Sequence, residues 1–281
     1  MTVAADTLAE DFARDGVLCL RSALDAREMA LVDRAYDHRL ARLTERAAWL
    51  YPKPGTTFMT DMTNKSVWHD PPFKRLLEET SLGEIARRCF GGGQVWFYYE
   101  QIFLKEGESR RTPWHQDSSY LPVGGPDQAR IWIPLDPVPI EDALEFVAGS
   151  HRGLTYNTSS FSEGDDTEPF DPTIDLPRLP DIEANRAVWP IVSWALVPGD
   201  LLVFHPALLH GGGATRASGR RRTLTIVMIG EDAQYQPHFS ADTPAEVGAD
   251  ADGGFAGLLP GDPFRLPDLI RIPLPAVNAA G

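Results

Sequence analysis

The chain has 281 residues and a formal net charge of -14, and 43% of its residues are hydrophobic, as in ordinary globular proteins. The acidic balance argues against nucleic acids and anionic membranes as partners, because both require a basic surface. No apolar run approaches the ~20 residues of a membrane span, and two cysteines exclude a disulfide scaffold. With no secretory leader visible, we expect a cytoplasmic protein with one domain over residues 1–281.

The N-terminal third is predicted to be mainly helical. Residues 5–14 predict a short helix, and a strand follows at 17–20. Apolar residues at helical spacing predict a second helix over 24–47 and a third over 72–90. The intervening residues 56–70 show no clear period, and we expect them to be irregular.

The following part of the chain is predicted to be rich in strands. The aromatic run 95–105 is long enough for a central strand, in which Gln101 and Lys105 share one face. Strand patterns return at residues 128–136, 189–196, 201–205 and 220–229.

Two stretches lack any regular pattern. Residues 155–188 are rich in Ser, Gly, Asp and Pro, and such a long aperiodic stretch predicts a lid, a binding loop or a mobile insertion. Residues 231–281 are rich in Pro, Gly, Ala and Asp. They predict an irregular C-terminal segment: a tail wrapping the core, a second lid, or a partly disordered end.

A candidate metal site is formed by His115, Asp117 and His210. The first two are two residues apart, so in an extended strand their side chains project to the same face. His210 stands 95 residues further on (210 − 115) and opens the run His-Gly-Gly-Gly. Two imidazoles and one carboxylate are the ligands of non-haem Fe(II) oxygenases. A lone His-x-Asp is common by chance, and His205 competes with His210 for the third position.

A candidate anion site follows on the next strand. Arg221 stands eleven residues after His210 (221 − 210), and a guanidinium binds a carboxylate through two parallel hydrogen bonds. Thr223 is two residues away, so in a strand its hydroxyl lies on the same face. The pair would suit a carboxylate bound beside a metal.

Taken together, these motifs resemble the phytanoyl-CoA dioxygenase family of Fe(II)/2-oxoglutarate oxygenases, in the family's order and over most of residues 8–230. Single motifs such as His-x-Asp are weak signals, whereas the ordered set is specific. The matching segments are Asp11-Phe-Ala-Arg-Asp-Gly16, Gln101-Ile-Phe-Leu-Lys105, Trp114-His-Gln-Asp117, Gly149-Ser-His151, Pro198-Gly-Asp200, and His210-Gly-Gly-Gly213 with Arg221.

The resemblance implies a β-rich α+β fold: a double-stranded β-helix (a jelly roll, cupin-like) flanked by N-terminal helices. It implies that His115, Asp117 and His210 bind Fe(II), and that Arg221 holds the distal carboxylate of 2-oxoglutarate. We also expect three further residues beside the cosubstrate: Gln101, Trp132 and Thr223. For Trp132, a place in the core is an equally good interpretation.

The chain departs from the family at two positions. Gly212 stands where the family often has Ser, so Thr223 or another group would supply the missing hydroxyl. Asp142-Ala143 stands where the family usually has Asn-Gly, which would affect a turn rather than the iron site.

The implied activity is the O2-dependent oxidation of a small organic molecule, with 2-oxoglutarate converted to succinate and CO2. Family halogenases have a small residue in place of the carboxylate ligand, so Asp117 favours hydroxylation, desaturation or cyclisation. The substrate is open, and a natural-product intermediate is one candidate class. Two other functions remain open: a cupin-like metalloenzyme that does not use 2-oxoglutarate, and a non-catalytic jelly-roll binding protein. The oligomeric state is also open.

Overall fold

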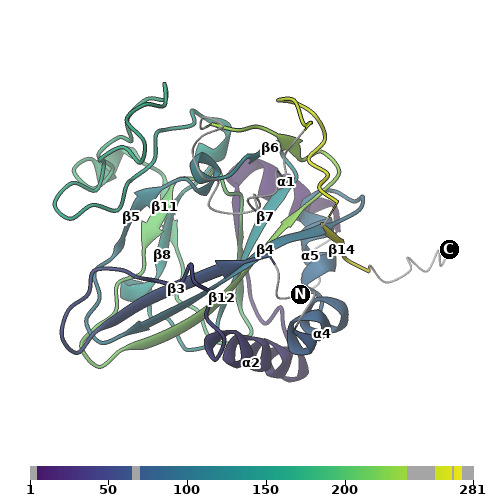
Figure 1. Cartoon of the computed structure of the whole chain (residues 1–281), viewed down its shortest axis with the longest axis horizontal. Helices are drawn as coiled ribbons and strands as arrows, with labels where there is room; N and C mark the ends of the chain where they lie inside the picture. The colour runs from purple at the N-terminus through teal and green to yellow at the C-terminus, as the bar shows by residue number, and fades with distance from the viewer. Residues whose placement is uncertain (1–4, 65–69, 239–256, 268, 274–281) are drawn as a thin grey trace.

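The computed structural model describes residues 5–64, 70–238, 257–267 and 269–273, and its helices gather at one side of two β-sheets (Figure 1). The predicted second helix ends earlier than expected, and the predicted third helix is two helices that break at Thr80, whose hydroxyl donates to the carbonyl of Leu76. The helices are α1 (Ala5–Asp15), α2 (Ala26–Leu40), α4 (Pro71–Glu79) and α5 (Leu82–Cys89). In the part of the chain that is described, no helix is long and apolar enough to cross a membrane.

The larger sheet has the strand order β1-β10-β7-β12-β4-β3-β2, with β14 added beside β4. Its strands are β1 (Val17–Leu20), β10 (Leu201–Phe204), β7 (Gln128–Pro134), β12 (Arg220–Ile229), β4 (Trp96–Glu106), β3 (Thr57–Thr63), β2 (Ala48–Trp49) and β14 (Ile270–Arg271). The expectation that residues 56–70 are irregular was wrong for β3, which pairs with β4 along its whole length. Three of its seven residues are apolar, but Phe58 and Met59 are adjacent, so apolar and polar residues do not alternate regularly.

The smaller sheet has the strand order β5-β11-β8-β9, and a two-stranded sheet joins β13 to β6. Their bounds are β5 (Thr112–His115), β11 (His210–Gly212), β8 (Leu144–Val147), β9 (Ile191–Ser193), β13 (Gln234–Tyr235) and β6 (Val123–Gly124). Trp132 and Phe204 of the larger sheet pack with Leu144 and Phe146 of the smaller one in one buried cluster. The two sheets thus face each other, which confirms the predicted jelly roll.

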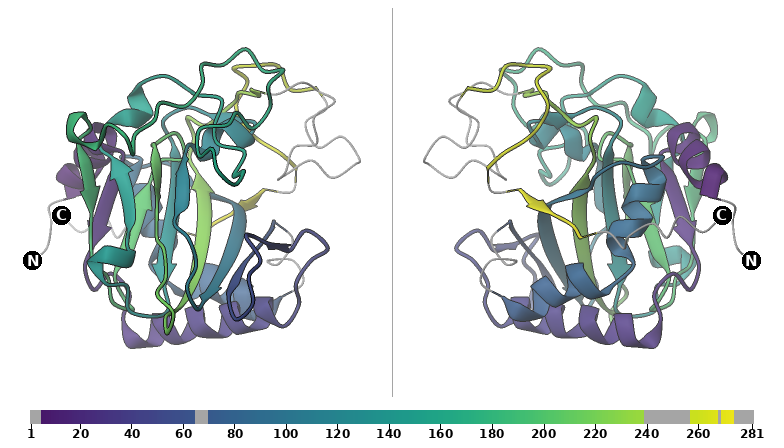
Figure 2. Two further views of the ribbon diagram at one scale, coloured as in Figure 1. Left: turned by 90° about the vertical axis from the view of Figure 1, so that its left-hand side faces the viewer. Right: turned by 90° about the vertical axis from the view of Figure 1, so that its right-hand side faces the viewer.

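The helices cover the outer face of the larger sheet (Figure 2). Helix α2 begins with a capping box: the Asp25 side chain accepts from the backbone N–H of Glu28, and the Glu28 side chain accepts from that of Asp25. Its buried face includes Leu31, Val32 and Tyr36, whose hydroxyl donates to the carbonyl of Phe103 in β4. The opposite face of the sheet is left free to form the interior between the two sheets.

Arg39 at the end of α2 is a buried link between helix and sheet. Its guanidinium lies 2.9 Å from Asp61 of β3 and 3.0 Å from Glu100 of β4, and all three side chains are almost fully buried.

Arg39→Met should lower the free energy of unfolding by about 3–5 kcal/mol, because two buried carboxylates lose a shared counter-ion. Urea unfolding would measure this. Arg34→Met, on the exposed face of the same helix, should change stability by no more than about 0.5 kcal/mol; equal effects of the two variants would contradict the assignment.

Candidate metal centre

Three predicted ligands meet between the two sheets. His115 at the end of β5 and His210 at the start of β11 are direct cross-strand partners, and their ring centroids are 4.1 Å apart. Asp117 does not continue the strand as predicted but begins a 3-10 turn. Because the intervening Gln116 has an extended backbone, the side chain of Asp117 still points to the same side as that of His115. One ligand atom from each of the three buried residues lies within 4.8 Å of the other two.

Hydrogen bonds orient both imidazoles. The Nδ1 atom of His115 is 2.9 Å from the carbonyl of Pro113, and that of His210 is 2.9 Å from the carbonyl of Leu208. A carbonyl only accepts, so each Nδ1 carries the proton and each Nε2 keeps a free lone pair. These Nε2 atoms lie 3.5 Å and 3.7 Å from the Asp117 carboxylate oxygens. The lone pairs and the carboxylate converge as metal ligands must.

The charge state of the cluster also suits a metal. Burial, together with the neighbouring His115, lowers the pKa of His210 to about 3, so its ring is neutral. Burial raises the pKa of Asp117, but the charge of Arg130, with the contacts from the two histidines, outweighs burial and holds the pKa below its usual range. Two imidazoles and one carboxylate are the donor set that Fe(II) takes in its oxygenases.

His205 is excluded as the third ligand by its own hydrogen bonds. Its Nδ1 accepts from the backbone N–H of Ala207 at 3.1 Å, and its Nε2 lies 3.1 Å from the carbonyl of Gly125. Both ring nitrogens are therefore in use, and His205 lines a separate cavity. The choice of His210 over His205 agrees with this arrangement.

The metal cluster lines a cavity of about 740 Å³, and two cations line the same cavity. Lys105 and Arg221 are cross-strand partners on β4 and β12. Both donate to the carbonyl of Gly213, Lys105 at 2.7 Å, and Arg221 also donates to the carbonyl of Asp142 at 2.7 Å. The sequence places Lys105 only on the same strand face as Gln101, and the structure shows that it is also the cross-strand neighbour of Arg221.

Neither of these two cations has an ion-pair partner within 4.0 Å among the described residues. The carboxylate of Asp142 acts on Arg221 only from a longer distance. Burial and the charge of Arg221 hold the pKa of Lys105 well below its usual value, and burial lowers the pKa of Arg221 to about 10. Two adjacent buried cations are costly unless an anion joins them. This part of the cavity is therefore suited to an anionic group.

Two other predicted residues lie near this anion site. The guanidinium of Arg221 is 6.0 Å from the ring centroid of Trp132, which is buried and lines the cavity. The hydroxyl of Thr223 also lines the cavity and has no hydrogen-bond partner in the described structure. An anion bound by Arg221 would find a free donor in Thr223.

Gln101 lies farther along the cavity, near the metal cluster. It is four residues from Lys105 on β4, which corresponds to roughly 13 Å along a strand. Its side-chain oxygen accepts from Arg130, and its amide nitrogen donates to Thr60 at 2.8 Å. Its predicted contact with the cosubstrate stays a prediction.

Two residues of the site received no role from the sequence. Arg130 donates to the Asp117 carboxylate. The only feature of the sequence that points to the site is that Arg130 lies on the same face of its predicted strand as Trp132. The ring of Phe161 lies 5.2 Å from that of His115, and its backbone has a φ of 60°, a conformation that side chains rarely adopt. Phe161 gave no signal because it lies in an aperiodic stretch.

Residues 155–188 are irregular, as predicted, apart from one short 3-10 turn at Arg186–Val188, and they lie beside β5 and β11 (Figure 1). Ser160, Phe161 and Phe170 of this segment line the cavity. Two tyrosine hydroxyls bind its backbone: Tyr120 donates to the carbonyl of Ser159 at 2.6 Å, and Tyr51 to that of Phe161 at 2.8 Å. The segment therefore forms one wall of the cavity.

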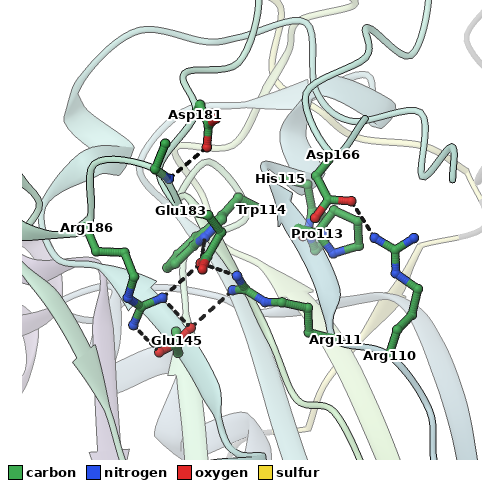
Figure 3. Close-up of polar contacts among 11 residues, drawn as sticks. Arg110, Arg111, Pro113, Trp114, His115, Glu145, Asp166, Asp181, Glu183 and Arg186 are labelled. Atoms are coloured by element: carbon green, nitrogen blue, oxygen red, sulfur yellow. Dashed lines mark hydrogen bonds and ion pairs between the residues drawn. The ribbon is translucent and has the colours of Figure 1, made fainter. Parts of the chain in front are cut away.

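An ionic network fastens the far end of this segment to the smaller sheet (Figure 3). Arg111 and Arg186 each contact both Glu145 and Glu183, and the indole N–H of Trp114 donates to Glu183 at 2.7 Å. Arg110 pairs separately with Asp166. Because these side chains are partly exposed, the network should contribute little to the free energy of unfolding. Its expected effect is to hold the end of the 155–188 segment against the smaller sheet.

Arg111→Gln should therefore speed backbone hydrogen exchange in residues 181–188 several-fold, because two of the fastening contacts are lost. The free energy of unfolding should fall by less than about 1 kcal/mol. Arg75→Gln, which removes an exposed pair with Glu79 on α4, is the matched control and should leave this exchange unchanged. Unaltered exchange in the Arg111 variant would show that the network does not hold the segment.

The comparisons with known proteins agree with this geometry. The family model "Phytanoyl-CoA dioxygenase (PhyH)" matches residues 12–223. The human peroxisomal phytanoyl-CoA dioxygenase is 26% identical over 171 residues, which cover 58% of this chain and 48% of that protein. The chain thus matches about half of the length of this curated relative.

Two enzymes of nogalamycin biosynthesis have a similar fold. The epimerase SnoN, solved in complex with Fe3+, alpha ketoglutarate and nogalamycin RO, aligns over 96% of this chain and 99% of its own, with a TM-score of 0.68 and 23% identity. The alpha-ketoglutarate-dependent carbocyclase SnoK aligns over 97% of both chains, with a TM-score of 0.68 and 19% identity. At these identities the likeness shows the fold.

Proposed function

The chain belongs to the phytanoyl-CoA dioxygenase family, and from that membership we propose that it is an Fe(II)- and 2-oxoglutarate-dependent dioxygenase that oxidises a C–H bond of a small organic molecule. The observation that carries the proposal is the content of one cavity. A cluster of two histidines and one carboxylate lies at one place, and two cations that have no ion-pair partner among the described residues lie at another. A metal alone would explain the first feature; a dicarboxylate that reaches from the metal to the cations explains both.

Each side chain has a definite task in this proposal. His115, Asp117 and His210 hold Fe(II), which with bound 2-oxoglutarate supplies the activation of O2 for C–H oxidation. Arg221 and Lys105 bind the far carboxylate of 2-oxoglutarate, one through a planar fork and the other as a point charge. The Thr223 hydroxyl donates to the same carboxylate and replaces the serine that the family often has at the position of Gly212.

Asp117 also bears on the type of reaction. Because the carboxylate ligand is present, we propose hydroxylation, or a related desaturation or cyclisation, rather than halogenation. Aromatic rings would limit the access of bulk water to the metal: Phe161 packs against His115, and the rings of Tyr120 and Phe170 meet edge to face with 4.8 Å between their centroids. A dry site of this kind protects a reactive centre from side reactions.

The cavity favours an uncharged, ring-containing substrate, such as a natural-product intermediate. Beyond Lys105 and Arg221, the basic side chains other than the two histidines among the described lining residues are Arg46 and Arg130, and Arg130 is paired with Asp117. An acyl-CoA ester would need several cations for its phosphates. The rest of the lining is rich in aromatic side chains, which include Phe58, Tyr99, Phe103, Tyr120, Phe161 and Phe170.

We further propose a cytoplasmic location and no nucleic-acid partner. Cys19 and Cys89 are free thiols, which suits a reducing compartment. The net charge of -14 disfavours nucleic acid.

The test is an anaerobic titration of the metal-free protein with Fe(II) and then with 2-oxoglutarate, followed by visible spectroscopy. The expected result is the charge-transfer band of chelated 2-oxoglutarate, after which candidate substrates are screened by succinate release. Iron binding without a band would favour a cupin-like metalloenzyme that does not use 2-oxoglutarate. No iron binding at all would favour a non-catalytic binding protein.

A further inference from the structure

Arg130 bridges the metal cluster and the neighbouring strands. It extends from β7 into the cavity and is only 7% exposed. One guanidinium nitrogen donates to Oδ2 of Asp117, and the other donates to the side-chain oxygen of Gln101. Within the described residues, Asp117 is the one carboxylate in ion-pair contact with this guanidinium. The charge of Arg130 is therefore balanced by a predicted metal ligand and by no other group of the site.

This contact restrains the carboxylate of Asp117. A free aspartate can rotate and present either oxygen, or both, to a metal. Here Oδ2 accepts from Arg130 and lies 3.7 Å from Nε2 of His210, while Oδ1 lies 3.5 Å from Nε2 of His115. The carboxylate is thus held in one rotation, with one oxygen occupied by a hydrogen bond. A ligand fixed in this way leaves more of the metal's positions open for other groups.

Arg130 is itself held by a chain of hydrogen bonds. A guanidinium only donates, so the oxygen of the Gln101 amide must face Arg130 and its nitrogen must face away. That nitrogen donates to the hydroxyl of Thr60 at 2.8 Å. Because the sheet order is β7-β12-β4-β3, the chain from Arg130 to Thr60 crosses four neighbouring strands. The ring of Tyr99 packs beside the guanidinium at 5.8 Å.

We propose that Arg130 is a positioning residue of the metal site: it fixes the Asp117 carboxylate as a one-oxygen ligand, and Gln101 and Thr60 hold Arg130 in place for that task. This inference rests on the proposed function. It also assigns Gln101 to the support of the metal ligand rather than to contact with 2-oxoglutarate. The outer partners of metal ligands generally matter in this way, and their loss costs about 10–100-fold in metal affinity or activity.

The test uses Fe(II) affinity and the anaerobic charge-transfer band, so it needs no substrate. Arg130→Met should raise the Fe(II) Kd by about 10–100-fold and shift or weaken the band, because Asp117 is free to rotate. Arg130→Lys should recover part of the Fe(II) affinity and part of the charge-transfer band, because one ammonium reaches Asp117 but cannot also hold Gln101. Gln101→Leu should change both in the same direction by less. Arg222→Met is the control: this arginine pairs with Asp136, outside the lining of the cavity, and both readouts should stay at wild-type values.

A folded Arg130→Met protein with the wild-type Kd and band would overturn the inference. If that variant does not fold, wild-type values in both Arg130→Lys and Gln101→Leu would overturn it instead. If the wild-type protein binds Fe(II) without forming a band, the proposed function fails. The order of Fe(II) affinities among the wild-type protein and the Arg130 and Gln101 variants then still decides the role of Arg130. A wild-type protein that binds no Fe(II) would overturn both.

Discussion

Replacing His210 by alanine is expected to abolish Fe(II) binding and all iron-dependent turnover. His210 supplies one of three converging ligand atoms, and in the described structure no fourth His, Cys, Asp or Glu joins the cluster to take its place. His115→Ala and Asp117→Ala should have the same result. The measurement is Fe(II) binding to the anaerobic protein, followed by succinate formation from 2-oxoglutarate in air. Circular dichroism would establish that each variant is folded.

The matched control for this experiment is His205→Ala. His205 lies five residues before His210 and is also buried, but both of its ring nitrogens bond to backbone atoms. This variant should keep Fe(II) binding, with some loss of stability from the two broken hydrogen bonds, about 1–3 kcal/mol in total. Near-normal oxygenase activity in the His210 variant, with loss in the His205 variant, would transfer the ligand role to His205.

Arg221→Met is expected to raise the concentration of 2-oxoglutarate needed for half-saturation steeply, while Fe(II) still binds. Truncating one partner of a buried, hydrogen-bonded charge pair costs about 2–5 kcal/mol, and 2 kcal/mol already corresponds to roughly a 30-fold weaker Kd. Titration of the charge-transfer band with 2-oxoglutarate measures this directly. Lys105→Met should act in the same direction with a smaller effect, since an ammonium makes no planar, two-point contact.

Arg220→Met is the control for the Arg221 variant. Arg220 is the preceding residue of β12, is exposed, and pairs with Asp136. It should leave 2-oxoglutarate binding unchanged. If Arg221→Met also binds 2-oxoglutarate with wild-type affinity, the anion site belongs to another ligand, and the metalloenzyme that does not use 2-oxoglutarate becomes the better hypothesis.

The fold was predictable from local patterns wherever a period was clear. Helix α1 and strands β1 and β4 lie close to the predicted ranges, and the ordered motifs identified the family that the model match shows. Prediction failed where neighbours override local pattern. Strand β3 has a weak pattern of its own and depends on its pairing with β4, and the long predicted second helix stops at Leu40.

The sequence by itself determined the identity of the candidate ligands, because His-x-Asp, the glycine run after His210, and Arg221 are local chemical signals. It could not decide which groups meet. The cross-strand pairing of His115 with His210 and of Lys105 with Arg221 depends on sheet register over long separations, which no local pattern specifies. The contact of Arg130 with Asp117 and the cover of Phe161 over His115 likewise exist only after the sheets and the 155–188 segment have packed. Burial in that packed interior then sets the protonation of these groups, so the tertiary structure decides what the predicted residues can do.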